Sequence, residues 1–262
     1  MTGFFPTRVL PVLMYHRIGD ADRDDASLFV SETNFKAQMR WLRDNGFETL
    51  SLDRAVELWT YNRTPRRSIL ITFDDAFAET LVVAARVLTE ANMKATVFAP
   101  SGLLGQEVEL RSPVGHSHST SRGRIASGND LKAWRDQGFD VGSHSSTHPD
   151  LTSETPARIL IEAQDSKRSL EEILQSPVVD FCYPYTHHNA ICRRLVERCG
   201  YRSAFAGEPP MHDLYAIPRM MIYPDDSISR FSRKASGYYY WASAWHQRLT
   251  AGGRHAKPLS AS

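Results

Sequence analysis

The chain has 262 residues, of which 42% are apolar and 23% charged, and its 31 Lys and Arg against 30 Asp and Glu leave a formal net charge of +1. This composition is typical of a globular protein and excludes wholesale disorder, and the balanced charge gives no indication of nucleic acid or an anionic membrane as the main partner. A chain of this length buries about three quarters of its unfolded surface and needs no disulfides to fold. Its three cysteines form no CxxC pair, which favours a reducing compartment.

The N-terminal segment and the apolar runs bear on location. Residues 1–8 contain no basic region followed by a long apolar run, so no secretory leader is expected. The predicted location is cytoplasmic, with secretion left open if a leader has been removed. The longest apolar runs, near 69–73 and 81–85, are too short to cross a bilayer, so no transmembrane segment is expected. We expect one domain over residues 1–250 and a disordered tail over residues 251–262.

Apolar periodicity and turn residues predict alternating strands and helices. Phe35, Met39 and Leu42, for example, recur at helical spacing, and Gly46 ends that helix. The alternation predicts a parallel α/β architecture, either a barrel or an open sheet. In chain order we expect a strand at 9–15, helices at 33–45 and 51–59, a strand at 68–73, a helix at 79–91, a strand at 95–99, irregular chain over 101–127, a helix at 130–137, a strand at 139–142, a helix at 156–174, a strand at 178–183, a helix at 189–199, strands at 201–206 and 215–223, and an outer helix whose apolar stripe runs from 231 to 249.

Polar or aromatic side chains directly follow four of the predicted strands. His16 follows the first strand, Asp74 and Asp75 follow the strand at 68–73, His144 follows the strand at 139–142, and Tyr185 lies beyond the strand at 178–183. In parallel α/β folds the chemistry lies just beyond the C-terminal ends of the strands. We therefore expect these side chains to meet at one rim of the sheet.

The residue types at this rim suit a divalent ion. The imidazoles of His144 and His148 together with one carboxylate make a three-ligand site that leaves positions open for water and substrate. Adjacent aspartates leave the backbone in different directions, so one can bind the ion while the other acts as a base. Taken alone, an Asp-Asp pair is often a turn or helix N-cap, and His-x-x-x-His is a weak metal signal. Their joint occurrence at strand ends favours the functional interpretation.

Three motifs resemble those of the polysaccharide deacetylases, which are carbohydrate esterase family 4 and carry the NodB homology domain. Residues 71–75 (ITFDD) resemble the first family motif, T-F-D-D. Residues 144–149 (HSSTHP) resemble the second, H-[ST]-x-x-H-P, and residues 181–185 (FCYPY) are similar to the third, usually R-x-P-[FY]. The resemblance extends from Leu10 to Leu249, and the three motifs agree in order and spacing.

The resemblance implies an α/β fold, a distorted (β/α)7-type barrel, and an activity. The activity is metal-dependent removal of an N-acetyl or similar small N-acyl group from an amino sugar in a polysaccharide, oligosaccharide or glycoconjugate. Asp74 corresponds to the general base of the family. Asp75, His144 and His148 correspond to the ligands of one divalent ion, usually zinc, with cobalt or nickel as alternatives.

The third motif of the family lines the sugar groove, which implies substrate-binding roles for Pro184 and Tyr185, with the Tyr185 backbone N–H beside the developing oxyanion. Cys182 stands where this motif usually has the arginine that partners the base. Arg219 is expected to bind substrate or to replace that arginine beside Asp74. An arginine that lies on the surface or pairs with a helix is equally compatible with the sequence.

The opening segment, residues 11–18 (PVLMYHRI), resembles the Y-H-x-I motif of a circularly permuted subgroup that includes the biofilm poly-N-acetylglucosamine deacetylases. In that subgroup the opening histidine acts as the general acid, and this chain lacks the C-terminal L-x-x-H motif of other members. The resemblance therefore implies that His16 is the general acid. A lone histidine after a strand is otherwise more often structural.

Two other functions stay open at this point. One is a deformylase or deacylase acting on a lipid- or nucleotide-linked amino sugar, and the other is a catalytically silent sugar-binding protein on the same fold. No basic stripe or repeat supports a nucleic-acid partner. His116 and His118 are expected in a mobile loop on the substrate side, and His187 and His188 are further candidates for the groove.

Overall fold

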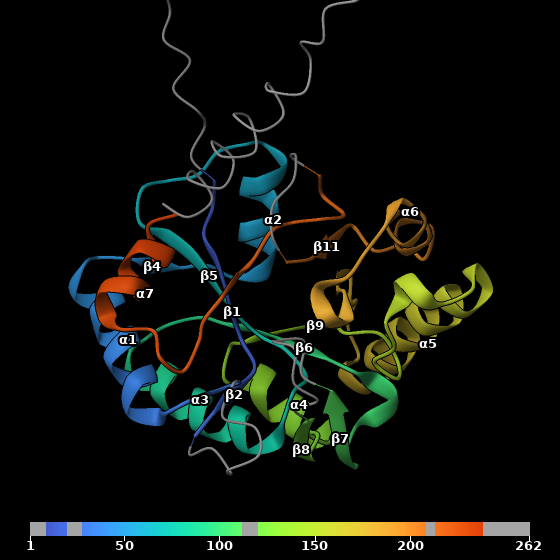
Figure 1. The fold of residues 1–262 in the computed structure, drawn as a ribbon, viewed down its shortest axis with the longest axis horizontal. Coiled ribbons are helices and arrows are strands. Elements are labelled where there is room, and N and C mark those ends of the chain that lie inside the picture. The colour runs from blue at the N-terminus through green and yellow to red at the C-terminus, as the bar shows by residue number, and fades with distance from the viewer. Residues whose placement is uncertain (1–8, 20–27, 112–119, 208–212, 238–262) are drawn as a thin grey trace, which may run out of the picture.

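A parallel sheet curled into a half-barrel forms the centre of the fold (Figure 1). The computed structural model describes residues 9–19, 28–111, 120–207 and 213–237. The strand order along the sheet is β11-β10-β9-β6-β5-β1-β12, with β4 also paired to β5, and every pair in this sheet is parallel. The predicted α/β barrel of the (β/α)7 type is confirmed in this distorted, incompletely closed form.

The strands are short, and most of them are buried. They are β1 (Val12–Tyr15), β2 (Arg17–Ile18), β3 (Phe29–Val30), β4 (Glu48–Thr49), β5 (Ser68–Phe73), β6 (Thr96–Ala99), β7 (Glu107–Arg111), β8 (Thr120–Arg124), β9 (Asp140–Ser143), β10 (Asp180–Cys182), β11 (Ser203–Phe205) and β12 (Met220–Met221).

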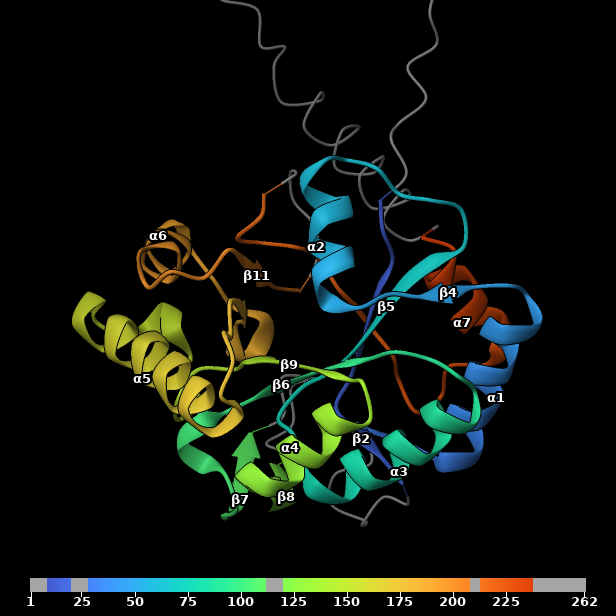
Figure 2. The same ribbon diagram turned by 180° about the vertical axis from the view of Figure 1, so that it is seen from behind.

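Helices other than α2 cover the outside of the sheet. Most helices begin at a capping side chain, because Ser, Thr or Asn accepts a hydrogen bond from the first turn. Figure 2 shows α5 and α6 on one side, α1 and α7 on the opposite side, and α3 and α4 along one edge. The helices are α1 (Glu32–Asp44), α2 (Leu52–Thr60), α3 (Ala78–Glu90), α4 (Gly128–Asp136), α5 (Pro156–Leu174), α6 (Ala190–Arg198) and α7 (Ile228–Ala235), with 3-10 turns η1 (Ser101–Leu103), η2 (Leu151–Ser153) and η3 (Pro184–Thr186).

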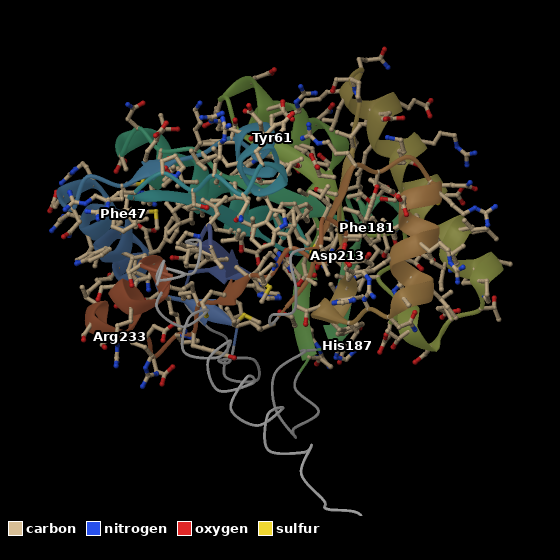
Figure 3. All side chains as sticks on the ribbon, turned by 90° about the horizontal axis from the view of Figure 1, so that it is seen from above. Phe47, Tyr61, Phe181, His187, Asp213 and Arg233 are labelled. Atoms are coloured by element: carbon tan, nitrogen blue, oxygen red, sulfur yellow. The ribbon has the colours of Figure 1, made fainter. Side chains whose placement is uncertain are left out.

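The period-two alternation of the strands separates the core into outer and inner parts. On β5, Ile69 and Ile71 face the outer helices, whereas Leu70 faces inward and packs with Val12 of β1. Helix α2 packs against this inner face and contributes five apolar residues to it, so α2 fills the interior near the start of the strands. A third cluster, which includes Phe181, lies between β10, β11 and the helices α5 and α6 (Figure 3).

Two expectations from the sequence need correction. The segment 101–127 is not irregular throughout, because it contains η1 and the antiparallel hairpin β7–β8. The strand predicted at 215–223 is reduced to the two residues of β12, preceded by a single bridge between Ile217 and Phe205. Of the stripe predicted at 231–249, residues 231–235 belong to α7, and residues 238–249 lie outside the described residues. The predicted tail at 251–262 lies outside the described residues, and no described helix is long and apolar enough to cross a membrane.

Candidate active site

The alternation that builds the core also aims the candidate residues inward. Val12, two residues before Met14 and four before His16, belongs to the inner cluster, and Leu70 is four residues before Asp74. An even spacing on a strand keeps side chains on one face. On β9, Gly142 lies against the Phe98 ring, where a Cβ would come within 2.4 Å of it, and His144 follows two residues later. The ends of β1, β5 and β9 thus converge on one interior space.

Asp75, His144 and His148 lie together in this space, and all three are buried. The Nε2 atoms of His148 and His144 lie 3.2 and 3.5 Å from Asp75 Oδ1. Burial disfavours the charged form of Asp75, but the two histidines outweigh it and hold the pKa of Asp75 well below its usual value. Asp75 and His148 both have positive φ, 67° and 61°, so the backbone adopts an uncommon conformation at two of the three positions.

The donor set fits a divalent ion. His144 Nδ1 lies 2.9 Å from the carbonyl oxygen of Cys182, which can only accept, so Nδ1 carries the proton and the lone pair of neutral His144 is on Nε2. That lone pair faces Asp75 Oδ1, a buried oxygen for which the described residues provide no hydrogen-bond donor. Two such acceptors face each other favourably only with a proton or a cation between them. One carboxylate and two imidazoles are typical zinc ligands.

Asp74 is held by an arginine distant in sequence. The guanidinium of Arg219 donates to both oxygens of Asp74, at 2.6 and 2.7 Å, and also to the carbonyl of Ala206 at 3.2 Å. Burial disfavours ionisation, but Arg219 and His144 outweigh it and lower the pKa of Asp74. Arg219 is 1% exposed, which favours its role as the partner of Asp74 over the predicted role in substrate binding. The thiol of Cys182 lies 3.7 Å from Asp74 and leaves room for this arginine.

His16 also lies near Asp74. Its Nε2 is 4.0 Å from Asp74 Oδ2, and the side chain is buried. Burial lowers the pKa of His16, while the carboxylates of Asp74 and Asp75 act in the opposite direction. Its Nδ1 has no hydrogen-bond partner among the described residues, so no contact there fixes the ring in one tautomer. A histidine within reach of a carboxylate at a strand end is suited to proton transfer.

The third motif forms the 3-10 turn η3 beside these residues. Pro184 is buried, and Tyr185 has φ 57° and ψ 10°, with its ring 4.8 Å from the ring of His148. His187 lies further out, at the edge of the molecule (Figure 3), and pairs with Asp150 at 2.9 Å. His188 packs against the ring of Tyr183 instead.

Two residues near the site carry no signal in the sequence that singles them out. Arg17, next to His16, is buried between the rings of Phe29 and Phe77 and pairs with Glu79. It also donates to the hairpin β7–β8, so it fixes the hairpin beside the site. Glu162 on α5 binds the backbone between the two candidate histidine ligands. The predicted loop histidines His116 and His118 lie outside the described residues.

The sequence model of one family, polysaccharide deacetylase, matches residues 61–204, which include all three motifs. The chain belongs to the polysaccharide deacetylase family. The family resemblance inferred from the motifs is thereby confirmed, and the match covers more than half of the chain.

Individual relatives in this family match over most of the chain. The Bacillus subtilis protein YxkH, named as a polysaccharide deacetylase, is 30% identical over 227 residues, which are 85% of this chain and 74% of YxkH. The poly-beta-1,6-N-acetyl-D-glucosamine N-deacetylase of Staphylococcus aureus is 22% identical over 252 residues, covering 87% of this chain and 83% of that enzyme. The deacetylase PplD of Streptococcus pyogenes, solved with acetate, has the same fold, with a TM-score of 0.74, 23% identity and coverage of 87% of this chain and 99% of that one.

Proposed function

We propose that this polysaccharide deacetylase is a metal-dependent hydrolase that removes N-acetyl groups from amino sugars of a polysaccharide or oligosaccharide. One observation carries the proposal: a buried Asp75, His144 and His148 cluster lies beside a second aspartate, Asp74, which Arg219 fixes by both oxygens. The two aspartates thus have different surroundings, as a ligand and a base require. A silent sugar-binding protein would have no need of this arrangement.

A divalent ion held by Asp75, His144 and His148 would polarise the acyl oxygen and acidify a water molecule. Asp74 accepts the proton of the attacking water. Because Arg219 binds both of its oxygens, Asp74 stays ionised and its orientation is set before substrate arrives. The ring of Tyr185 packs against that of His148, and the Tyr185 backbone N–H is proposed to donate to the acyl oxygen as negative charge develops there.

His16 is proposed to protonate the leaving amine. An amine leaves poorly without a proton, so an acid is needed as well as a base. Among the described histidines near Asp74, His16 is outside the metal cluster. It directly follows β1 and is the histidine of the Y-H-x-I motif. This role supports placing the chain in the circularly permuted subgroup of the family. The similarity to the Staphylococcus aureus enzyme points the same way and makes poly-β-1,6-N-acetylglucosamine the first substrate to test.

The test is acetate release from N-acetylglucosamine oligomers by the zinc-loaded protein, together with its metal content. We expect about one ion per chain, and we expect Asp75→Ala, His144→Ala and His148→Ala each to lose metal and activity together, because two ligands hold zinc poorly. Asp165→Ala, an exposed carboxylate on α5, serves as the control. Full metal occupancy in all three variants, or no acetate from any oligomer, would refute the proposal.

A further inference from the structure

The loop between His144 and His148 contains neither helix nor strand, and its backbone is in an uncommon conformation. Ser145 and His148 both have φ 61°, in the left-handed region that residues with side chains rarely adopt. The ring of His144 is oriented by a hydrogen bond from its Nδ1 to the carbonyl oxygen of Cys182. For His148 the described residues provide no such contact at Nδ1. Apart from ring packing against His144 and Tyr185, the position of His148 therefore depends on what holds the backbone of the loop.

One side of this loop rests on the turn η1. The amides of Ser101 and Gly102 donate to the carbonyls of Ser145 and Ser146, at 3.2 and 2.8 Å. Gly102 is needed for this approach, because a Cβ there would lie 3.0 Å from the Ser146 carbonyl oxygen and 2.7 Å from its hydroxyl. These contacts fix the carbonyls of the loop and leave its amides to be satisfied elsewhere.

Two of these amides are satisfied by Glu162, in the second turn of α5, and the amide of His148 donates to the Ser145 hydroxyl at 3.0 Å. One oxygen of Glu162 accepts the N–H groups of Ser146 and Thr147, at 2.9 and 2.7 Å. The other accepts the Thr147 hydroxyl and the Arg158 guanidinium, both at 2.6 Å. Glu162 is 1% exposed and lies on the buried face of α5 among Ile159, Ala163 and Ser166. A carboxylate at such a position is costly unless its partners are well placed, and here four donors converge on it.

We propose that Glu162 is a positioning residue of the metal site: it holds the loop in the conformation that brings His148 to Asp75 and His144. This inference rests on the proposed function, since it assumes that the three residues bind a divalent ion. Glu162 touches none of the three side chains in any hydrogen bond and acts through the two amides between the histidines. Residues that orient metal ligands typically change metal affinity by about tenfold to a hundredfold when they are removed.

Three substitutions separate the reach of Glu162 from its charge. Glu162→Gln keeps the reach, because the amide oxygen can accept both N–H groups, and removes the charge. Glu162→Asp keeps the charge but is shorter by one methylene and cannot reach both amides. We expect the native protein and Glu162→Gln to bind zinc most tightly, Glu162→Asp less tightly and Glu162→Ala least. The zinc dissociation constant of Glu162→Ala should exceed that of the native protein by at least about tenfold. A charge acting through space would instead make Gln weak and Asp nearly native.

The matched control is Glu171→Ala on the same helix. Glu171 also accepts a lysine and a backbone N–H from the following segment, that of Val178, but it lies remote from the histidine loop. Its loss should leave zinc affinity unchanged. Equal loss of affinity in Glu171→Ala and Glu162→Ala, the reversed order of Gln and Asp, or native affinity in all Glu162 variants would overturn the proposal.

Hydrogen exchange of the native protein tests the role of Glu162 without depending on whether any variant folds. Thr147 is exposed, yet its amide is bound to Glu162, so its hydrogen exchange in the metal-free protein should be slowed well below that of exposed loop amides. Free exchange at Ser146 and Thr147 would refute the role of Glu162. Failure of the native protein to bind zinc would instead refute the proposed function, so the two failures can be told apart.

Discussion

The base candidate Asp74 is oriented by Arg219, which is 145 residues further along the chain. The family pattern places this arginine in the third motif, where the present chain has Cys182. In space the two positions are neighbours, because the Cys182 thiol and the Arg219 guanidinium both approach the Asp74 carboxylate. The same electrostatic contact thus comes from the residue just before β12 instead of from the last residue of β10, where a thiol small enough to accommodate it stands.

Arg219→Lys tests this contact. Lysine keeps the positive charge but cannot make two parallel bonds to a carboxylate, so we expect turnover to fall at least about tenfold with metal content unchanged. Arg219→Met should also cost stability, on the order of 3–5 kcal/mol, because it leaves a buried carboxylate without its partner. Acetate release, elemental analysis and thermal unfolding measure these effects. Native turnover in Arg219→Lys would show that Asp74 needs only a nearby charge.

His16→Ala tests the acid. If His16 protonates the leaving amine, the variant should lose about a hundredfold or more on the amide substrate while retaining its metal. An acetate ester with a good leaving group needs little protonation and should be hydrolysed at nearly the native rate. Equal losses on amide and ester would show that His16 has a structural role and that another group supplies the proton.

The sequence identified most of the residues at the site because they stand at predicted strand ends in recognisable motifs. It left the role of Arg219 open and did not single out Glu162. Arg219 is 145 residues from Asp74 in the sequence, and its contact with Asp74 depends on a strand order that local patterns do not determine. Glu162 occupies a position of α5 where an apolar residue would fit the helical pattern, and only the fold shows that two amides lie above it.

Among the elements, β9 and α2 are joined by a carboxylate far from the active site. Asp140, the first residue of β9, accepts the N–H of Leu52 at the start of α2, at 2.8 Å. Burial raises the pKa of Asp140, and the nearby Asp53 and Asp180 raise it further. The folded state therefore holds this proton more tightly than the unfolded chain does.

This shift gives a pH dependence with a definite sign. Because the pKa of Asp140 is higher in the folded state, its contribution to stability is full below its ordinary value of 3.8 and is lost as pH rises through the folded value. Asp140→Asn keeps an oxygen for Leu52 and carries no charge. We expect the melting temperature of the variant minus that of the native protein to increase as pH rises from 3.5 to 7. Asp165→Asn, at an exposed position, is the control. A constant difference across this range would contradict the shift.

Helices and strands were predicted correctly where apolar periodicity is strong. They were missed where contacts between residues far apart in the sequence determine the structure. Helix α5 and strand β5 have the predicted bounds, Pro156–Leu174 and Ser68–Phe73. The hairpin β7–β8 was missed because β8 has no apolar side chain, so the short alternation of Val108 and Leu110 with charged residues in β7 has no matching partner pattern. It is held against the fold by Arg17, a contact between residues more than a hundred positions apart.

For the whole molecule, alternating strands and helices correctly predict a parallel sheet but leave its order and closure undetermined. Strand β1 lies between β5 and β12, which come from the first third and from the end of the described chain. Helix α2 was predicted, but its place inside the curled sheet depends on which face of each strand is apolar. The seam between β11 and β12 has one bridge, and Arg219 donates across it to Ala206. The Arg219 side chain therefore orients Asp74 and also adds to the backbone hydrogen bonds across this seam, such as that from the Ala206 N–H to the Ile217 carbonyl at 2.9 Å.

The two ends of the described fold lie side by side. A Cβ added at Gly237, after α7, would lie 3.4 Å from the carbonyl oxygen of Val9, just before β1. Both lie at the N-terminal ends of the parallel strands, whereas His16, Asp74 and His144 lie at the C-terminal ends. An anchor on a solid support, or a fusion partner joined through either end, would therefore approach from the pole opposite the catalytic groups. The end of the sheet that carries these groups would then face away from the support.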